Sequence, residues 1–212
     1  MNIGIIGSGN IRAPLGRLWA NAGHRVLFAS RHPERLATVV ERAGGNARAG
    51  TAEEAAEFGE VILEAIPFGK IPELPADLLR GKPVLSAANY YPERDGEVDL
   101  GGLTQSEWIA RQLPGARLVK AFNMMQAKVM EALANGGGQP GLAIFFAGDD
   151  DKANRIAASL IAEARFTPIE VGPLRSGALF QTDGPLYNTQ FTAEEARAAL
   201  DRAVKQQDPR SA

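Results

Sequence analysis

Short hydrophobic runs alternate along the chain with longer segments in which hydrophobic residues recur every three or four positions. The short runs are typical of buried strands in a parallel sheet, and the longer spacing is typical of helices that cover a sheet. The predicted strands are 2–6, 25–29, 48–50, 61–66, 83–87, 117–121, 142–147 and 167–171. The predicted helices are 10–22, 33–43, 52–57, 106–112, 128–134, 152–163 and 192–204.

The alternation of strands and helices favours an α/β fold, with a doubly wound, mainly parallel Rossmann sheet and helices on both of its faces. The pattern changes near the end of the chain. Residues 177–186 are irregular, and 192–204 form a polar, alanine-rich helix. We therefore expect a Rossmann-type domain over 1–174 and a small C-terminal helical and irregular lobe over 175–212.

Composition narrows the class of partner. The chain has 212 residues, of which 45% are hydrophobic and 23% charged, and its formal net charge is −2. Interspersed charges of both signs give no indication of a nucleic acid or a membrane as the partner. The sequence has no cysteine and only two histidines, which excludes disulfides and thiolate sites and gives no pattern for a bound metal. The first residues lack a signal-peptide pattern, and we expect a cytoplasmic protein.

A glycine-rich turn joins the first predicted strand to the first predicted helix. Gly7-Ser8-Gly9-Asn10-Ile11 stands in the context that a dinucleotide fingerprint requires. Gly7 permits a tight turn, and Gly9 lets the backbone approach a pyrophosphate at the helix N-terminus. The third fingerprint position is normally glycine or alanine, and here it is Arg12. The turn indicates a bound dinucleotide, although a glycine pair is also common in ordinary turns.

The end of the second predicted strand indicates which dinucleotide is bound. Enzymes that use NAD usually carry an acidic residue there, which binds the 2′-hydroxyl of the ribose. This chain has Ser30 and Arg31 instead, with Arg35 one turn later. A hydroxyl and two guanidinium groups are suited to a 2′-phosphate, so we predict NADP(H) as the cofactor. The alternative is a solvated basic turn.

These residues resemble the coenzyme F420-dependent NADP oxidoreductase family. The resemblance rests on the glycine turn and Ser30-Arg31, and it continues in Ala65-Ile66-Pro67-Phe68 and Val119-Lys120-Ala121-Phe122-Asn123. It extends through 147–151 and 171–174, and thus over most of 1–187. The family implies a Rossmann domain with a C-terminal lobe, a homodimer, NADP over the strand ends, and a deazaflavin in a second cleft. Arg12 and Met124-Met125-Gln126 depart from its pattern.

The resemblance also implies roles for individual residues. The pyrophosphate side would be bound by Gly7, Ser8, Gly9, Asn10, Ile11 and Arg12. The 2′-phosphate would be bound by Ser30, Arg31 and Arg35, and the ribose and nicotinamide would be flanked by Ile66, Pro67, Asn89 and Asn123. The lobe would complete the acceptor cleft through Gly184, Pro185 and Leu186. We expect the opposite wall of that cleft to come from Phe68, Tyr90 and Met124.

Catalytic side chains are sparse in the sequence, as hydride transfer between two rings allows. The best candidate for a catalytic residue is Asn123, whose amide can bind a carboxamide or a carbonyl. Tyr90 and Tyr91 are expected either to pack in the hydrophobic core or to form an aromatic wall for a flat acceptor. Tyr187 is expected more often to be a core residue. A structural role is favoured for Lys120, in strand-end packing or in a pair with a carboxylate. His24 has the pattern of a structural residue, and Asp149–Asp151 that of a helix cap.

Three functions fit these residues. We expect an NADP(H)-dependent oxidoreductase that transfers hydride between NADPH and a planar carrier, either the deazaflavin coenzyme F420 or a flavin. The second possibility is a reductase that acts directly on a small imine or carbonyl, and it would need a proton donor beside the nicotinamide. The third is a non-catalytic NADP-binding sensor domain. A fold alone does not decide among them.

Overall fold

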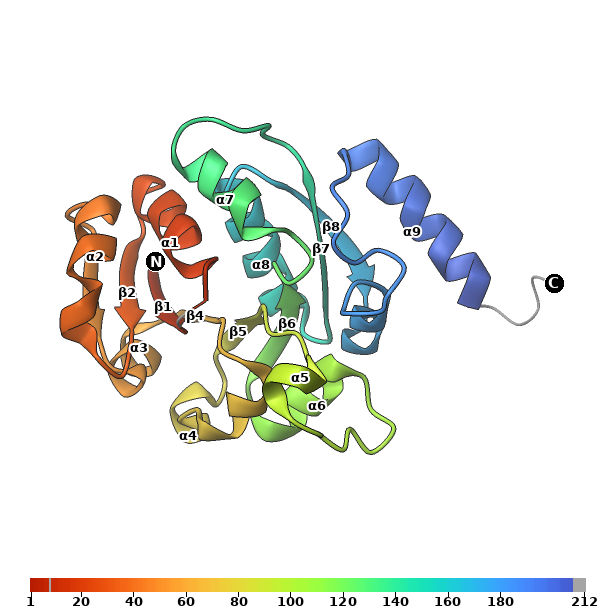
Figure 1. Cartoon of the computed structure of the whole chain (residues 1–212), viewed down its shortest axis with the longest axis horizontal. Helices are drawn as coiled ribbons and strands as arrows, with labels where there is room; N and C mark the ends of the chain where they lie inside the picture. Colours follow the sequence, from red (N-terminus) through yellow and green to blue (C-terminus); the bar gives the residue numbers. More distant parts are fainter. Residues whose placement is uncertain (8, 208–212) are drawn as a thin grey trace.

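The computed structural model describes residues 1–7 and 9–207 (Figure 1). The strands are β1 (Asn2–Ile6), β2 (Arg25–Ala29), β3 (Ala47–Gly50), β4 (Val61–Glu64), β5 (Pro83–Ser86), β6 (Arg117–Ala121), β7 (Ala143–Gly148) and β8 (Thr167–Gly172). The α-helices are α1 (Arg12–Asn21), α2 (Ala37–Ala43), α3 (Ala52–Phe58), α4 (Ala76–Leu79), α5 (Pro92–Asp95), α6 (Gln105–Gln112), α7 (Ala127–Ala134), α8 (Asp151–Glu163) and α9 (Ala193–Gln207). Short 3-10 helices are η1 (Pro33–Leu36), η2 (Phe68–Glu73) and η3 (Leu174–Leu179).

Within the described residues the strands form one sheet in the order β3-β2-β1-β4-β5-β6-β7-β8. All neighbouring pairs are parallel except β6 and β7, which are antiparallel. The order reverses direction at β1, because the chain first builds outward through β2 and β3 and then crosses to β4. This confirms the predicted mainly parallel, doubly wound sheet. The carboxyl ends of β1 and β4 therefore diverge into loops at a topological switch point, where such sheets bind ligands.

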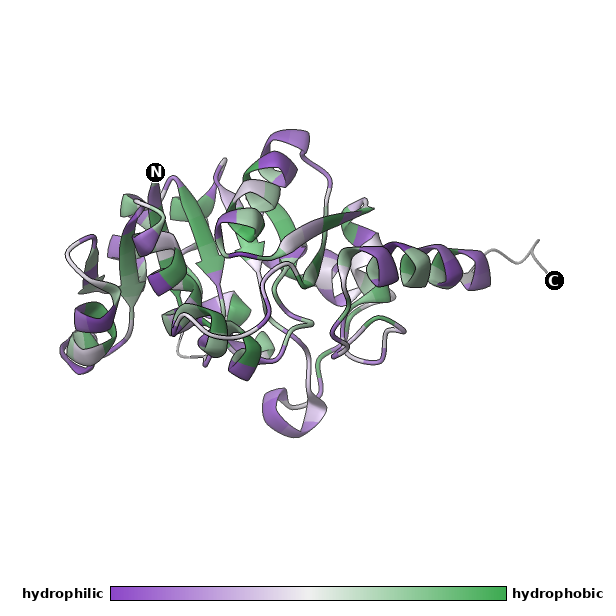
Figure 2. Ribbon diagram, turned by 90° about the horizontal axis from the view of Figure 1, so that it is seen from above, coloured by the Kyte–Doolittle hydropathy of each residue, from purple (hydrophilic) through white to green (hydrophobic). Residues whose placement is uncertain are grey.

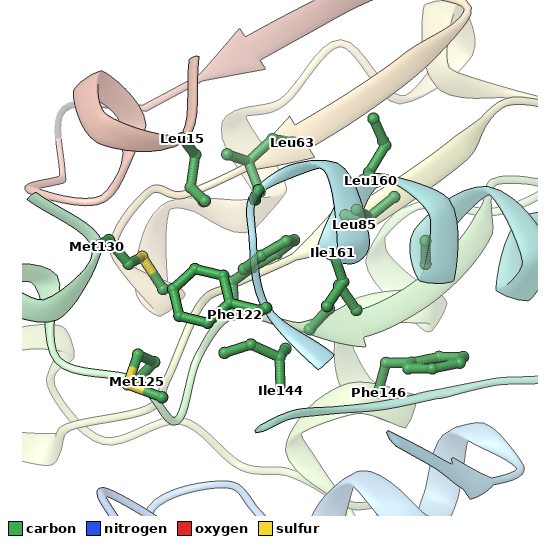
Figure 3. Packing of buried hydrophobic residues seen from close by; sticks show 14 of the residues in the cluster. Leu15, Leu63, Leu85, Phe122, Met125, Met130, Ile144, Phe146, Leu160 and Ile161 are labelled. Atoms are coloured by element: carbon green, nitrogen blue, oxygen red, sulfur yellow. The ribbon is translucent and has the colours of Figure 1, made fainter. Parts of the chain in front are cut away.

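Successive residues of each strand point to opposite faces, so the apolar strands supply two separate cores. Figure 3 shows one core, in which Leu63 of β4 and Leu85 of β5 pack against Leu15 of α1 and Ile161 of α8. The other core lies under α3, α4 and α6 and contains Phe68. Figure 2 shows hydrophobic strands between helices that carry their hydrophilic residues outward.

Local sequence signals account for several helix starts. Thr51 and Thr104 each accept a hydrogen bond from the third residue of the helix that follows, in complete capping boxes. Asp150 accepts a hydrogen bond from Ala153 N at 2.8 Å, which confirms the predicted helix-capping role of this acidic run. The predicted helix 33–43 divides into η1 and α2, since Pro33 starts it with a 3-10 turn.

The C-terminal part of the chain packs against the far end of the sheet. η3 follows β8 directly, and α9 lies alongside β8 with Ala196, Ala199 and Ala203 buried (Figure 1). His24, between α1 and β2, is hydrogen-bonded both to the Met1 amino group and to Glu163 of α8. These contacts support the structural role predicted for His24.

The described residues contain neither a membrane-spanning helix nor a cluster of metal-binding side chains. No helix in ranges 1–7 and 9–207 combines the length and the apolarity needed to cross a bilayer. Those ranges also contain no group of three or more histidine, aspartate or glutamate side chains placed to hold a metal ion.

Candidate functional site

A cleft of about 280 Å³ opens at the carboxyl ends of β1, β4, β5 and β6. It lies at the position where doubly wound sheets bind dinucleotides, because the loops that follow parallel strands meet at one edge. Its lining residues are Gly9, Asn10, Ile11, Ala65, Ile66, Pro67, Ala87, Ala88, Asn89, Tyr91, Arg94, Phe122, Asn123, Met125 and Tyr187. The fold thus gathers most of the residues predicted for the pyrophosphate, the ribose and the nicotinamide.

The glycine turn fits closely against the loop that leaves β4. Gly7 has a φ of +152°, and a Cβ built there would lie 2.3 Å from the Ala65 carbonyl oxygen. A Cβ at Gly9 would lie 3.2 Å from the same oxygen. The backbone at Gly7 consequently requires glycine. Gly9, at the other end of the turn, lines the cleft. Ser8, which was predicted to bind the pyrophosphate, lies outside the described residues.

Arg12 takes the place of the small third residue of the fingerprint. Its Nη1 donates a hydrogen bond to the Gly7 carbonyl oxygen at 2.8 Å, so the side chain folds back over the turn. Burial lowers the pKa of the Arg12 guanidinium. α1 begins at this residue without a side-chain cap or an acidic residue in its first turn. The backbone N–H groups of that turn are thus suited to an anion.

The predicted 2′-phosphate residues lie at the end of β2, beside β1 and at the same edge of the sheet. Ser30 N donates to the Gly50 carbonyl oxygen at 3.0 Å, and Ser30 Oγ accepts a hydrogen bond from His32 N at 3.0 Å. Arg31 and Arg35 are exposed. None of these residues lines the cleft itself.

Two asparagines form the floor of the cleft. Asn89 Nδ2 donates to the Asn123 carbonyl oxygen at 2.8 Å, and Asn123 Nδ2 donates to Asn89 Oδ1 at 3.0 Å and to the Phe180 carbonyl oxygen at 2.7 Å. The preceding residue, Phe122, has a φ of +62° and is buried. Asn123 Oδ1 is buried and accepts no hydrogen bond from the described residues. An unpaired buried acceptor of this kind is suited to a ligand that carries an N–H group.

The residues predicted for the acceptor walls require correction, because most of them lie in the core. Phe68 is fully buried and stacks on Trp108 with ring centroids 4.5 Å apart. Met124 and Leu186 are 1% and 2% exposed and belong to the opposite core. The hydroxyl of Tyr90 donates to the Gly96 carbonyl oxygen at 2.9 Å, away from the residues that line the cleft.

None of the three residues predicted from the C-terminal turn, Gly184, Pro185 and Leu186, is among those that line this cleft. Gly184 lies against the backbone of η3, where a Cβ would come within 2.5 Å of the Ala178 carbonyl oxygen. Pro185 is exposed. The next residues along the chain bring Tyr187 to the cleft, and Tyr187 lines it where Leu186 was expected.

The cleft has a polar mouth formed by Tyr91, Arg94 and Tyr187, a grouping that the sequence did not indicate. The hydroxyls of Tyr91 and Tyr187 are hydrogen-bonded to each other across the cleft. Arg94 stacks over the Tyr91 ring at 5.0 Å and donates to the Asn89 carbonyl oxygen at 2.6 Å. Burial raises the pKa of the Tyr187 hydroxyl, and its bond with Tyr91 raises it further, so Tyr187 is protonated at neutral pH. Both tyrosines line the cleft, so their hydroxyls are proton-bearing groups within it.

These observations fit a bound NADP(H). The glycine turn would receive the pyrophosphate at the start of α1, and Ser30, Arg31 and Arg35 are suited to the 2′-phosphate. Asn123 lines the cleft, and its side-chain amide is of a type suited to the carboxamide of a nicotinamide.

Comparison with known proteins supports the same cofactor. Residues 2–90 match the family described as NADP oxidoreductase, coenzyme F420-dependent. The chain is 28% identical to metalloreductase STEAP3 of Rattus norvegicus over 177 residues, which make up 82% of this chain. The chain spans only 34% of the length of that curated relative. The family and this relative are oxidoreductases, which confirms the resemblance drawn from the sequence.

Solved structures share the fold. A hypothetical protein from Sinorhizobium meliloti is 29% identical with a TM-score of 0.76, and the match covers 91% of this chain and 95% of that one. A protein from Arthrobacter sp. FB24, described as an F420-dependent NADP-reductase, is 22% identical with a TM-score of 0.68 over 84% of this chain and 87% of that one. A reductive aminase from Aspergillus terreus, in complex with NADPH, is 18% identical with a TM-score of 0.61 over 84% and 56%. The last two establish the fold alone.

Proposed function

We propose that the chain transfers hydride between NADPH and a planar carrier, on the premise that residues 2–90 match the family described as NADP oxidoreductase, coenzyme F420-dependent. The carrier is the deazaflavin coenzyme F420 or a flavin. The observation that carries the proposal is the cleft itself, which joins the glycine turn at Gly9 to the polar floor at Asn123. These are the two ends that a dinucleotide has to bridge in order to present its nicotinamide.

The chain contributes binding, orientation and exclusion of water. Gly7, Gly9 and the first turn of α1 hold the pyrophosphate, and Arg31 and Arg35 select the 2′-phosphate. When bound, NADPH supplies the hydride from its dihydronicotinamide ring. Asn123 orients the carboxamide of that ring, since Asn89 and the Phe180 carbonyl fix the asparagine side chain from the other side. Ile66, Phe122 and Met125 form apolar parts of the cleft that keep water from the reacting carbons.

The tyrosine pair supports a second candidate, direct reduction of a small imine or carbonyl. That reaction adds hydride to carbon and requires a proton at nitrogen or oxygen. Tyr91 and Tyr187 carry hydroxyl protons at the mouth of the cleft. A planar carrier requires no such donor from the chain, so the two candidates differ in how much they depend on these hydroxyls.

The proposal is tested by following NADPH oxidation against coenzyme F420, flavins, a cyclic imine and a small ketone, with NADH in parallel. We expect turnover with NADPH, and the highest kcat/KM with coenzyme F420 or a flavin. A preference for the imine or ketone would support the second candidate. Tight NADPH binding with no turnover on any acceptor would overturn both and favour a sensor.

The proposal includes a cytoplasmic homodimer, which the family resemblance supports. Light scattering at several protein concentrations tests the oligomer. A mass of one chain, 22.6 kDa, at all concentrations would remove the dimer from the proposal and leave the cleft unaffected.

A further inference from the structure

Three polar residues lie side by side within the sheet, directly below the cleft. Glu64 ends β4, Ser86 ends β5, and Lys120 is the penultimate residue of β6. Glu64 is paired with Ser86 in the parallel register, and Ser86 is paired with Lys120. All three point to the face that also holds Phe68 and Trp108, since Ile62, Val84 and Leu118 lie two positions earlier in the same strands. Each of the three is completely buried.

This row binds the backbone of both walls of the cleft. Glu64 Oε1 accepts a hydrogen bond from Ile66 N at 2.8 Å, and Ile66 lines the cleft on the β4 side. Lys120 Nζ donates to the Ala88 carbonyl oxygen, and Ala88 lines the cleft on the β5 side. Ser86 Oγ donates to Glu64 Oε2 at 2.7 Å, and Ser86 is the register neighbour of Lys120 on β6. The loops after β4 and β5 are therefore fixed by buried polar groups.

Burial of a carboxylate and an ammonium in an apolar layer is costly, and well-packed apolar residues of similar volume often stabilise such an interior equally well or better. The proposed mechanism leaves Glu64 and Lys120 without a role. We propose that they are positioning residues for NADP(H), which hold the Ile66 and Ala88 walls and set the charge beneath the nicotinamide. The inference rests on the proposed function, because it takes the ring to lie in this cleft.

The pair changes its charge near neutral pH. Burial raises the pKa of the Glu64 carboxyl to about 7, against the opposing effects of Ser86, Ile66 N and the Lys120 charge. Burial lowers the pKa of the Lys120 ammonium to about 8, against the charge of Glu64. The pair thus passes from a net positive charge below both values, through neutrality, to a net negative charge above them.

The charge of the Glu64–Lys120 pair should affect which redox form of the nicotinamide binds more tightly. The nicotinamide ring of NADP⁺ is cationic and that of NADPH is neutral, so a positive pair disfavours NADP⁺ and a negative pair favours it. Among the described residues, the charged groups that act on Glu64 are Lys120 and Arg94. Arg94 Nη2 lies 2.8 Å from Asp95 Oδ2. The other polar neighbours carry no charge. Ser86 of β5 is hydrogen-bonded to Glu64, and Ser106 of α6 lies, like the Lys120 side chain, beside Gly177.

The test is the ratio of the dissociation constants of NADP⁺ and NADPH, measured by calorimetry from pH 6 to pH 9. The ratio cancels the titration of the 2′-phosphate, which both forms share. We expect the ratio to fall about tenfold as pH rises, and to become independent of pH in the double variant Glu64→Gln/Lys120→Met. The double variant also removes both buried charges together, which avoids leaving one of them unpaired.

Lys82→Met is the matched control. Lys82 donates to the Ala56 and Gly59 carbonyl oxygens at the opposite end of β5, and its loss should leave the ratio and its pH dependence as in the wild type. A wild-type ratio that does not change with pH would overturn the inference while leaving the proposed function intact. A wild type that binds neither nucleotide would instead refute the proposed function. If the double variant does not fold, the wild-type titration alone decides.

The single variants separate the two parts of the inference. Glu64→Gln keeps a side-chain oxygen for Ile66 N, so it should keep the nucleotide affinity at the midpoint pH and shift only the pH profile. Glu64→Leu removes that acceptor and should also raise the KM for NADPH. Equal KM values for the Gln and Leu variants would contradict a positioning role for Glu64.

Discussion

Asn89 and Asn123 come from loops after neighbouring strands, and each donates a side-chain N–H to the other across the floor of the cleft. The pair lies 34 residues apart in sequence and is buried. It leaves Asn123 Oδ1 as the polar atom of the floor with no partner among the described residues. The side chain of Asn123 is thus fixed by Asn89 Oδ1 and by the Phe180 carbonyl oxygen.

Asn123→Ala should lower both stability and turnover. The change removes the donors for Asn89 Oδ1 and for the Phe180 carbonyl oxygen, so we expect a loss of about 1–3 kcal/mol in the free energy of unfolding. We also expect a larger loss in kcat than in NADPH affinity, since the pyrophosphate contacts remain. Urea unfolding and steady-state kinetics measure the two effects. An unchanged kcat would exclude Asn123 from the reaction.

Arg31→Ala should weaken NADPH far more than NADH. A charge-assisted contact to a phosphate contributes about 1.5–3 kcal/mol, or roughly 10- to 150-fold in affinity. Arg202→Ala, on the exposed side of α9, is the matched control and should change neither affinity. Equal losses for NADPH and NADH in the Arg31 variant would be incompatible with recognition of the 2′-phosphate.

Gly9→Val should abolish nucleotide binding and retain the fold. The branched side chain would occupy the surface on which the pyrophosphate lies, and its Cβ would meet only the Ala65 carbonyl oxygen at 3.2 Å. Gly45→Val is the control, because a Cβ there meets nothing within 4 Å. Circular dichroism verifies both folds, and fluorescence titration measures NADPH binding. Wild-type affinity in the Gly9 variant would place the phosphate elsewhere.

Tyr91→Phe and Tyr187→Phe should distinguish the two candidate reactions. Each change removes one hydroxyl and keeps the ring, so NADPH affinity should change less than about threefold. Transfer to coenzyme F420 or a flavin should be retained, whereas reduction of an imine or ketone should fall about 10²-fold or more without its proton donor. The activity ratio between the two acceptor classes is the measurement. A parallel loss on both classes would assign the tyrosines to binding.

Glu64→Gln should remove a pH dependence of stability between about pH 4.5 and pH 7. The folded pKa of Glu64 is raised above its unfolded value, so its contribution to stability is fully present below the unfolded pKa and is lost as pH rises to about 7. The wild type should therefore lose about 3 kcal/mol more than the variant across this window. Urea unfolding at several pH values compares the slopes. Parallel slopes would mean that Glu64 is ionised in the folded state throughout.

The strands and the nucleotide turn were predictable because each depends on local sequence. Apolar runs located every strand to within two residues at each end, and the position of Gly7 and Gly9 between a strand and a helix located the turn. The edge at which the loops meet then followed from the parallel order of the strands. Asn89 and Asn123 could be assigned to the cleft on that basis.

The acceptor side was not predictable, because loops carry no periodicity that tells which side chain faces inward. Tyr90 and Tyr91 are adjacent, yet Tyr91 lines the cleft and Tyr90 bonds to Gly96. Tyr187 meets Tyr91 across 96 residues of sequence, a pairing that only the folded chain reveals. The motif Gly184-Pro185-Leu186 directly precedes a residue that lines the cleft. Leu186 is buried in the core, and the next residue, Tyr187, lines the cleft instead. Glu64 was likewise hidden in an apolar run.

The central claim is that hydride passes directly from NADPH in this cleft to an acceptor. The most direct measurement is single-turnover transfer from NADPH deuterated at C4 on one face or the other, with mass spectrometry of the reduced acceptor. We predict that deuterium appears in the product from only one of the two stereoisomers, since the walls at Ile66 and Ala88 expose one face of the ring. Deuterium from both stereoisomers, or no transfer to any acceptor despite bound NADPH, would contradict the account.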